Sequence, residues 1–320
     1  MNKVSEKRFF VGIDTSNYTT SVSFVNGDGD VIANIKRLLP VKEGESGLRQ
    51  SDAVFAHIKN LSLLSDTIRE LNAQGEIAAV GYSAYPRDAE GSYMPCFLVG
   101  ETVAKTLAAF LNVPTYKFSH QSGHIRAALY SSKAVPERDF AAFHLSGGTT
   151  EVLHVKNENG TYRIDILGGS IDLHAGQAID RAGVLMGLKF PCGKEMDALA
   201  KLNSKKTPNP KICVNAFECN LSGLENMAAS LYAKTKDPSY VSAFVFDFIG
   251  ETVKRISENV RKEYPDIKII YAGGVSGNSI IRKKLENSFS DVYFASPEFS
   301  SDNAAGIALL TKESFFENNL

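Results

Sequence analysis

The pattern of apolar and polar positions in the first 120 residues predicts strands at the N-terminus, followed by helices and further strands. Residues 9–13 form a short apolar run, and 19–25 and 31–36 flank the turn Asn26-Gly27-Asp28-Gly29, which is typical of a β-hairpin. Apolar residues then recur at helical spacing over 53–73. This half is completed by a buried strand over 77–83, a long loop over 85–95, a helix over 98–111 and a short strand after Pro114.

The same order of elements begins again near residue 140. A strand is predicted over 140–145, and 151–155 and 162–167 flank the turn Asn157-Glu158-Asn159-Gly160. Segment 16–22 (SNYTTSV) stands 130 residues before segment 146–152 (SGGTTEV), and each follows a buried strand and leads into a hairpin. We interpret this as an internal duplication; the alternative is a chance likeness of two Ser/Thr-rich turns.

The C-terminal part alternates between helices and strands. Helices are expected over 173–186, 194–202, 241–263, 280–289 and 303–312, strands over 267–271 and 292–294, and an exposed linker over 203–211. Each half is then a hairpin sheet covered by helices, so the predicted fold class is α/β. Because 320 residues suffice for two lobes, we place the N-terminal lobe at 8–136 and the C-terminal lobe at 137–320. The last helix, about 303–313, is expected to pack back toward the N-terminal lobe.

Charge and cysteine content limit the classes of function. The 35 Lys and Arg residues nearly balance 36 Asp and Glu residues, so the net charge is −1 and no global basic field for nucleic acid exists. A local basic patch on one face of the protein is still compatible with this composition. Residues 1–8 are polar and precede no apolar core, and no run approaches the roughly 20 apolar residues of a membrane span. We therefore expect a cytoplasmic protein with reduced thiols, since no C-x-x-C spacing occurs among Cys96, Cys192, Cys213 and Cys219.

Two glycine-rich turns are candidates for binding phosphate. Ser146-Gly147-Gly148-Thr149-Thr150 lies between two strands of a hairpin, where adjacent glycines allow backbone amides to approach an anion closely. Gly273-Gly274-Val275-Ser276-Gly277-Asn278 lies between a strand and a helix, so the unpaired amides of a helix N-terminus follow it. A two-glycine turn alone is more often an ordinary turn; two such turns in one repeated framework make a phosphate-binding role as well supported as that alternative.

His120 and His124 form a possible pair of metal ligands. Their spacing places both imidazoles on one face of a helix, about one turn apart, which suits zinc or iron. The alternative is a pair of surface or capping histidines. No Glu follows the first histidine, so the helix is not that of a zinc protease. A third ligand is required, and spacing does not select it.

Two further clusters carry carboxylates. In the segment 172–181, Asp180 is a candidate to contact a ribose or a metal-bound water, with Gly193 and Asp197 nearby in sequence; the alternative is a helix cap at Asp172 with solvated charges. In the segment 300–306, Ser301 or Asp302 fits a helix N-cap. We interpret three other histidines as structural: His57, His144 and His154.

These motifs occur together, in this order, in one family. Over about residues 9–312 the chain resembles the tRNA threonylcarbamoyl transferase family, once labelled sialoglycoprotein endopeptidase. The family's H-x-x-x-H matches His120 and His124, its strand–S-G-G–strand turn matches 145–149, and its helix ending in F-D corresponds to Ala178-Ile179-Asp180. The L-G-L-x-[YF]-P-x-G, G-G-V-x-x-N and D-N-A-A motifs correspond to 185–193, 273–278 and 302–305.

The resemblance implies a duplicated two-lobe fold of the actin, sugar-kinase and heat-shock type, with a nucleotide in the cleft between the lobes. It implies that Asp302 joins His120 and His124 in holding one divalent metal per subunit, iron or zinc. It also implies a set of residues that bind the nucleotide, ATP or threonylcarbamoyl-AMP: Leu145, Ser146, Gly147, Gly148, Thr149, Asp180, Gly193, Asp197 and Asn278.

The reaction implied by the resemblance is metal-dependent transfer of a threonylcarbamoyl or related carbamoyl group from its adenylate to N6 of adenosine 37 in tRNA. The metal would act as a Lewis acid, and glycine amides would offset charge on the AMP leaving group. The expected partners are tRNA as the acceptor, the nucleotide, and a second copy or a related tRNA-modification protein as a homodimer or heterodimer. No membrane association is expected.

The chain departs from the family pattern on the substrate side. Thr149 replaces the histidine of S-G-G-H-T, Asn17 lies in a first loop that is acidic in the family, and Gln177 replaces a carboxylate. We interpret the chain as a diverged paralogue. Two alternatives stay open: a non-catalytic nucleotide-binding paralogue that partners an active transferase, and a small-molecule kinase of the same fold.

Overall fold

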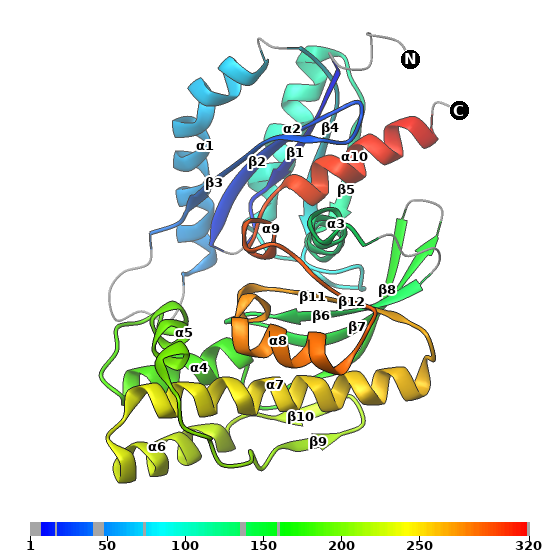
Figure 1. The fold of residues 1–320 in the computed structure, drawn as a ribbon. Coiled ribbons are helices and arrows are strands. Elements are labelled where there is room, and N and C mark those ends of the chain that lie inside the picture. The colour runs from blue at the N-terminus through cyan, green and yellow to red at the C-terminus, as the bar shows by residue number, and fades with distance from the viewer. Residues whose placement is uncertain are drawn as a thin grey trace. The chain divides into compact units, whose positions relative to one another are not determined.

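The computed structural model describes residues 8–16, 18–40, 48–72, 75–134, 139–158 and 161–318 (Figure 1). Contacts divide the chain into two compact units. Unit 1 consists of Met1–Tyr130, Asn157–Arg163 and Ser301–Leu320, and unit 2 consists of Ser131–Lys156 and Ile164–Ser300. Asn17 and the predicted turn residues Asn159 and Gly160 lie outside the described residues, so those predictions are not addressed.

Unit 1 is built on a five-stranded sheet in the order β3-β2-β1-β4-β5. The first three strands form an antiparallel meander, and β4 and β5 add to β1 in parallel. The predicted hairpin turn is present, since the amide of Gly29 donates to the carbonyl of Asn26. The strands are β1 (Arg8–Asp14), β2 (Thr19–Asn26), β3 (Val31–Leu38), β4 (Glu76–Tyr85) and β5 (Thr115–Ser119).

Helices cover both faces of this sheet. On one face, Phe9, Val11 and Ile13 of β1 pack with apolar side chains of α1 (Gln50–Asn72) and α2 (Phe97–Leu111). On the other face, Phe10 packs against α10 (Ala305–Glu317), the last helix (Figure 1). The central strand is therefore apolar at consecutive positions, as expected for a strand buried on both faces. α3 (His120–Ser132) follows β5 directly.

The sheet of unit 2 repeats the topology of unit 1. Its order is β12-β11-β6-β7-β8, with β6 antiparallel to β7 and parallel to β11, and β11 parallel to β12. Read from its other end, this is the order of the first sheet, strand for strand. The predicted duplication and α/β class are confirmed. The strands are β6 (Asp139–Leu145), β7 (Thr150–Glu158), β8 (Thr161–Gly169), β11 (Lys268–Ala272) and β12 (Val292–Phe294).

The core of unit 2 lies between its sheet and the long helix α7 (Pro238–Glu263), which also packs against its neighbours. Those neighbours are α4 (Ala175–Leu185), α5 (Gly193–Leu202), α6 (Gly223–Thr235) and α8 (Ser279–Ser288). The sequence analysis did not predict α6, the short α9 (Pro297–Ser300), or the hairpin of β9 (Cys213–Asn215) and β10 (Glu218–Asn220). The 3₁₀ turn η2 (Gly274–Gly277) occupies the second glycine-rich segment.

Two predicted helix caps are wrong. His174, not Asp172, is the N-cap of α4, and Asp172 instead accepts hydrogen bonds from the amides of Leu221 and Ser222, about 50 residues away. The N-cap of α10 is Ala304, with Asn303 accepting from the amide of Ala305, so neither Ser301 nor Asp302 has that role. In both cases the carboxylate contacts residues far away in the sequence: the amides at 221 and 222 for Asp172, and the two histidines of α3 for Asp302.

Within the parts of the chain that the structure describes, no helix is both long enough and apolar enough to cross a membrane. No disulfide bond joins the four cysteines, all of which lie in the described residues, and three of them are buried.

Candidate functional site

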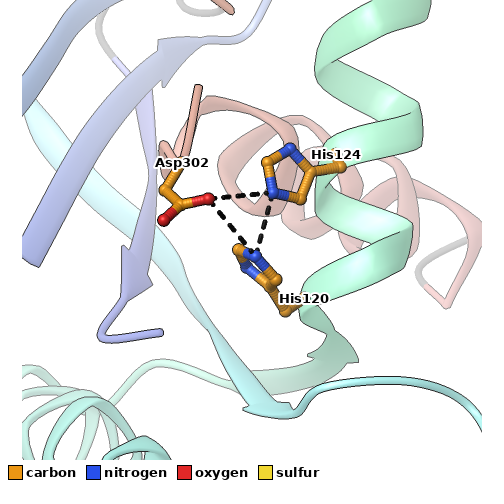
Figure 2. Close-up of side chains that lie close together, drawn as sticks. All are labelled: His120, His124 and Asp302. Atoms are coloured by element: carbon orange, nitrogen blue, oxygen red, sulfur yellow. Dashed lines mark hydrogen bonds and ion pairs between the residues drawn. The ribbon is translucent and has the colours of Figure 1, made fainter. Parts of the chain in front are cut away.

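Three side chains of unit 1 converge on one point. His120 and His124 lie one turn apart on α3, and Asp302 lies just before α10 (Figure 2). The two Nε2 atoms are 2.9 Å apart, and Oδ1 of Asp302 lies 3.2 Å from Nε2 of His124 and 3.7 Å from Nε2 of His120. Both imidazoles are about nine-tenths buried. Residues separated by about 180 positions thus form one cluster of three potential ligands.

The spacing of these atoms fits a metal ion. The circle through the two Nε2 atoms and Oδ1 of Asp302 has a radius of about 1.9 Å, close to the roughly 2.0–2.2 Å at which zinc binds nitrogen and oxygen ligands. Two imidazoles and one carboxylate are also a common set for zinc or non-haem iron with open positions. The residues present therefore fit one divalent cation.

A buried carboxylate lies behind the first histidine. Oδ2 of Asp14, at the end of β1, lies 2.7 Å from Nδ1 of His120, and Oδ1 accepts a hydrogen bond of 2.8 Å from the amide of Ser16. The Asp14 residue is 1% exposed. Its contact requires a proton on Nδ1 of His120, which leaves Nε2 as the atom that faces the cluster. Asp14 was not predicted as a site residue; the available signal was an acidic residue at the end of an apolar strand.

The electrostatics of the cluster favour positive charge. Burial alone would lower the pKa of His120, but the carboxylates of Asp14 and Asp302 raise it to about 10. Burial alone would raise the pKa of Asp302, but hydrogen bonds from His120 and His124 hold it well below its ordinary value. The two carboxylates therefore favour a positive charge at this point, as a bound cation would supply.

Close packing of two helices brings the third ligand to the pair. Gly123 lies between the two histidines on α3, and Gly306 lies in the first turn of α10. A Cβ atom on Gly306 would overlap the backbone carbonyl of Gly123, and one on Gly123 would lie 2.9 Å from the side chain of Ile307. The glycine pair therefore permits the approach that positions Asp302.

The long loop predicted after β4, here 86–96, holds the start of α3. The hydroxyls of Ser119 and Ser122 donate to Oδ2 of Asp88 at 2.5 and 3.0 Å. Ser119 also accepts from the amide of Ser122, and the carbonyl of Pro86 accepts from the amide of Gln121. Asp88 was not predicted as a functional residue. It fixes the turn of helix that contains the first histidine.

The two glycine-rich turns lie together in unit 2. Gly273, with φ of +93°, is packed against the carbonyl of Leu145, where any Cβ atom would clash. Gly176, near the start of α4, is packed against Gly147 in the same way and donates its amide to the carbonyl of Ser146. Four exposed glycines of the two turns face open space instead, since an added Cβ would meet no atom within 4 Å: Gly147, Gly148, Gly274 and Gly277.

The predicted carboxylate and amide residues have defined partners in unit 2. Oδ1 of Asn278 accepts from the amides of Ile280 and Ile281, and its Nδ2 donates to Asp197 at 2.6 Å. Both ends of this amide are therefore engaged. Asp180 accepts from the amide of Cys192, at the start of α5 next to Gly193, and burial raises the pKa of Asp180. The residues expected around a nucleotide thus belong to unit 2, and the metal cluster belongs to unit 1.

Two of the other histidines have polar partners outside the cluster. Nδ1 of His57 lies 2.8 Å from the hydroxyl of Thr20, and Nε2 of His154 lies 2.8 Å from Asp139. His144 lies in β6.

A comparison with protein families agrees with this geometry. The family model for tRNA N6-adenosine threonylcarbamoyltransferase (TsaD) matches residues 42–309, which include both histidines, Asp302 and both glycine-rich turns. The chain belongs to this family. The resemblance seen in the sequence is thereby confirmed, and a function of the tRNA threonylcarbamoyltransferase type is supported.

Solved structures show the same fold at low sequence identity. The activator of 2-hydroxyisocaproyl-CoA dehydratase from Clostridium difficile, with bound ADPNP, has a TM-score of 0.53 at 15% identity, with 97% of each chain covered. Component A of (R)-2-hydroxyglutaryl-CoA dehydratase from Acidaminococcus fermentans has a TM-score of 0.55 at 16% identity, covering 96% of this chain and 99% of its own. HypF from T. kodakarensis has a TM-score of 0.60 at 13% identity; 98% of this chain covers 48% of HypF, so the chain spans about half its length.

One departure from the TsaD pattern has a structural explanation. The side chain of Gln177 accepts a hydrogen bond from the amide of His174 and so takes part in capping α4. Gln177 is exposed, and the capping role requires only an acceptor oxygen. Thr149 closes the turn after β6 through its carbonyl, which accepts from the amide of Ser146. Because this hydrogen bond is made by the backbone, it does not depend on which side chain is at position 149.

Proposed function

We propose that this TsaD-family chain transfers a threonylcarbamoyl group from threonylcarbamoyl-AMP to N6 of adenosine 37 in tRNA, with one divalent metal, zinc or iron, held by His120, His124 and Asp302. The observation that carries the proposal is the buried three-ligand cluster with Asp14 behind it. A cytoplasmic site of action follows from tRNA as the acceptor.

In the proposed reaction, a bond forms between N6 and the carbamoyl carbon, and the bond from that carbon to the AMP oxygen breaks. N6 loses one proton to solvent, and AMP leaves. The metal, when bound, supplies Lewis-acid chemistry toward oxygens of the substrate. The two histidines, each about nine-tenths buried, and the partly exposed Asp302 would hold it.

The glycine-rich turns of unit 2 support a role in binding the adenylate. Gly147, Gly148, Gly274 and Gly277 are not required by packing, which is the pattern expected where backbone amides must approach a ligand. Asp180 has one carboxylate oxygen engaged by Cys192 and retains the other for a hydroxyl such as that of ribose. Asn278 donates a hydrogen bond to Asp197, and this contact supports the glycine-rich turn after β11.

The test is a purified reaction of the chain, threonylcarbamoyl-AMP and unmodified tRNA, with modified nucleosides measured by mass spectrometry. His124→Ala should abolish product and bound metal, whereas His154→Ala, a histidine with an aspartate partner in unit 2, should retain both. Folded, metal-loaded wild-type protein that yields no modified adenosine would reject the transfer reaction. Complementation of a transferase-depleted strain provides the second readout.

A second function is favoured by the changed substrate-side residues. A non-catalytic paralogue would bind nucleotide in unit 2 and form a stable complex with an active transferase. Thr149 and Gln177, which replace ionisable family residues, motivate this alternative. Turnover by the chain alone would exclude it, and stable co-purification with an active homologue without turnover would support it.

A further inference from the structure

We propose that Asp14 is a positioning residue for the metal centre, and that it sets the affinity for the metal by fixing the tautomer and the orientation of His120. This inference rests on the metal centre of the proposed function. It assigns a role to a residue that touches neither the metal position nor a substrate.

The main chain holds Asp14 in place. It is the last residue of β1, whose backbone pairs with β2 on one side and with β4 on the other, and it is opposite Ser21 in the ladder. The chain then turns, and the amide of Ser16 donates to Oδ1 of Asp14. One carboxylate oxygen is thus fixed by the backbone of the following loop.

The other oxygen is directed at His120. The contact between Oδ2 and Nδ1 is 2.7 Å, short for an N–H···O hydrogen bond and in the range of a charge-assisted one. With a proton held on Nδ1, only Nε2 can present a lone pair to a cation, and this is the atom 2.9 Å from Nε2 of His124. Because Asp14 is 1% exposed and both of its oxygens are engaged, it acts through His120 rather than on a ligand directly.

Besides Asp14, the His120 ring contacts His124 and Asp302 within the cluster and Phe97 outside it. Its edge-to-face contact with Phe97, at 6.2 Å between centroids, restricts the ring plane but does not distinguish the two nitrogens. A 180° flip of the ring would put Cδ2 in the place of Nδ1 and Cε1 in the place of Nε2, so it would break the hydrogen bond to Asp14 and turn Nε2 away from the cluster. The carboxylate is therefore the feature that selects the ligating nitrogen. Comparable partners of metal-bound histidines change metal affinity by 10- to 100-fold when removed.

The experiment measures Zn²⁺ and Co²⁺ affinity by competition with a chromophoric chelator, together with the visible spectrum of the Co²⁺ form. Asp14→Ala should weaken binding by about 10- to 100-fold. Asp14→Asn should weaken it less, because an amide oxygen still accepts from Nδ1 although the charge is lost. The Co²⁺ spectrum of Asp14→Ala should differ from that of the wild type, a change that loss of stability alone does not produce.

The matched control is Asp139→Asn, which removes a carboxylate from a 2.8 Å contact with His154 in unit 2. It should leave metal affinity unchanged. If Asp14→Ala does not fold, Asp14→Asn decides: a wild-type affinity and spectrum in that variant would overturn the inference.

The two proposals fail in different ways. Wild-type protein that binds neither Zn²⁺ nor Co²⁺ would reject the metal centre itself, and the role of Asp14 with it. Wild-type protein that loses its metal on His124→Ala, while the Asp14 variants bind as tightly as the wild type, would reject only the positioning role.

Discussion

The side-chain amide of Asn278 forms hydrogen bonds through both its oxygen and its nitrogen. Its Oδ1 caps α8 and its Nδ2 donates to Asp197, so it stabilises the turn after β11 from both ends. The family resemblance implies that it lies near the adenylate. The structure indicates that it shapes the turn on which the neighbouring glycine amides lie.

Replacing Asn278 by Ala should lower the free energy of unfolding by about 1 kcal/mol, because the amides of Ile280 and Ile281 lose their acceptor. Urea denaturation measures the change. Asn278→Ser retains a capping oxygen and should recover most of the loss. Equal stability of the Ala variant and the wild type would contradict the capping role.

The buried His57 makes the free energy of unfolding depend on pH. It is fully buried, and burial lowers its pKa to about 4 from an ordinary 6.5, against a smaller opposite effect of Asp14. Between these values the unfolded chain binds a proton that the folded protein excludes. The free energy of unfolding must therefore decrease as pH falls from about 6.5 toward 4.

His57→Gln should reduce this decrease by about 1–2 kcal/mol between pH 7 and pH 5, because the buried group no longer titrates. Chemical denaturation of both proteins at the two pH values measures it. An identical change in stability for the two proteins would show that His57 is not the group responsible.

The sequence predicted part of the metal cluster at this scale. Helical spacing alone brought His120 and His124 together, whereas Asp302 came only from the resemblance, since spacing cannot connect residues about 180 positions apart. Asp14 ends an apolar strand, which marks it as unusual, but its role was not predictable because its partner is 106 residues away in a different element. Local patterns identify ligands on one helix; tertiary contacts supply the rest.

At the scale of elements, the contact between α3 and α10 controls the metal cluster. Gly123 and Gly306 allow two helices that are more than 170 residues apart in the sequence to touch through their backbones. The position of Asp302, four residues before Gly306, depends on this contact.

Gly306→Ala should lower the free energy of unfolding by about 1–3 kcal/mol, because its Cβ overlaps the carbonyl of Gly123 and forces the helices apart. Metal affinity should fall as well, since Asp302 moves with α10. Thermal unfolding and chelator competition provide the two measurements.

The control is Gly250→Ala on α7, where the added Cβ would meet mainly the flexible side chain of Lys284. This change should be tolerated, and the higher helix propensity of Ala can make it stabilising. If both glycine variants bound metal as tightly as the wild type, the helix contact would not be what positions Asp302.

Most elements were predicted within a few residues, and the omissions have identifiable causes. The strands β9 and β10 have three residues each, which is too short for an alternation to register. Helix α6 could have been found, because Leu224, Ala228 and Leu231 follow helical spacing. The caps assigned to Asp172 and Asp302 failed because local spacing does not show which distant group a carboxylate serves.

At the scale of the molecule, the duplicated topology separates two binding tasks. The candidate metal cluster belongs to unit 1, and the candidate phosphate-binding turns belong to unit 2. Similar sheets therefore present different chemistry at the ends of their first strands: Asp14 is the last residue of β1, whereas Ser146 and Gly147 follow β6.

Hydrogen exchange should detect this separation. Zn²⁺ should slow exchange in α3 and around Asp302, whereas AMP should slow it in segments 146–149 and 274–278. At 100 times its Kd, the metal should also add about 2.7 kcal/mol to the free energy of unfolding. His124→Ala should remove the first effect and retain the second. Protection of segment 274–278 by Zn²⁺ alone would contradict the assignment.

The late position of Asp302 has a consequence for synthesis of the protein. Two ligands are made when little more than a third of the chain is complete, but the third leaves the ribosome only with the final segment. A chain that is truncated or clipped before residue 302 keeps both histidines and has no carboxylate to complete the cluster. The proposed metal would thus link α3 to the segment just before α10, and only a chain that extends past residue 302 can complete the three-residue cluster.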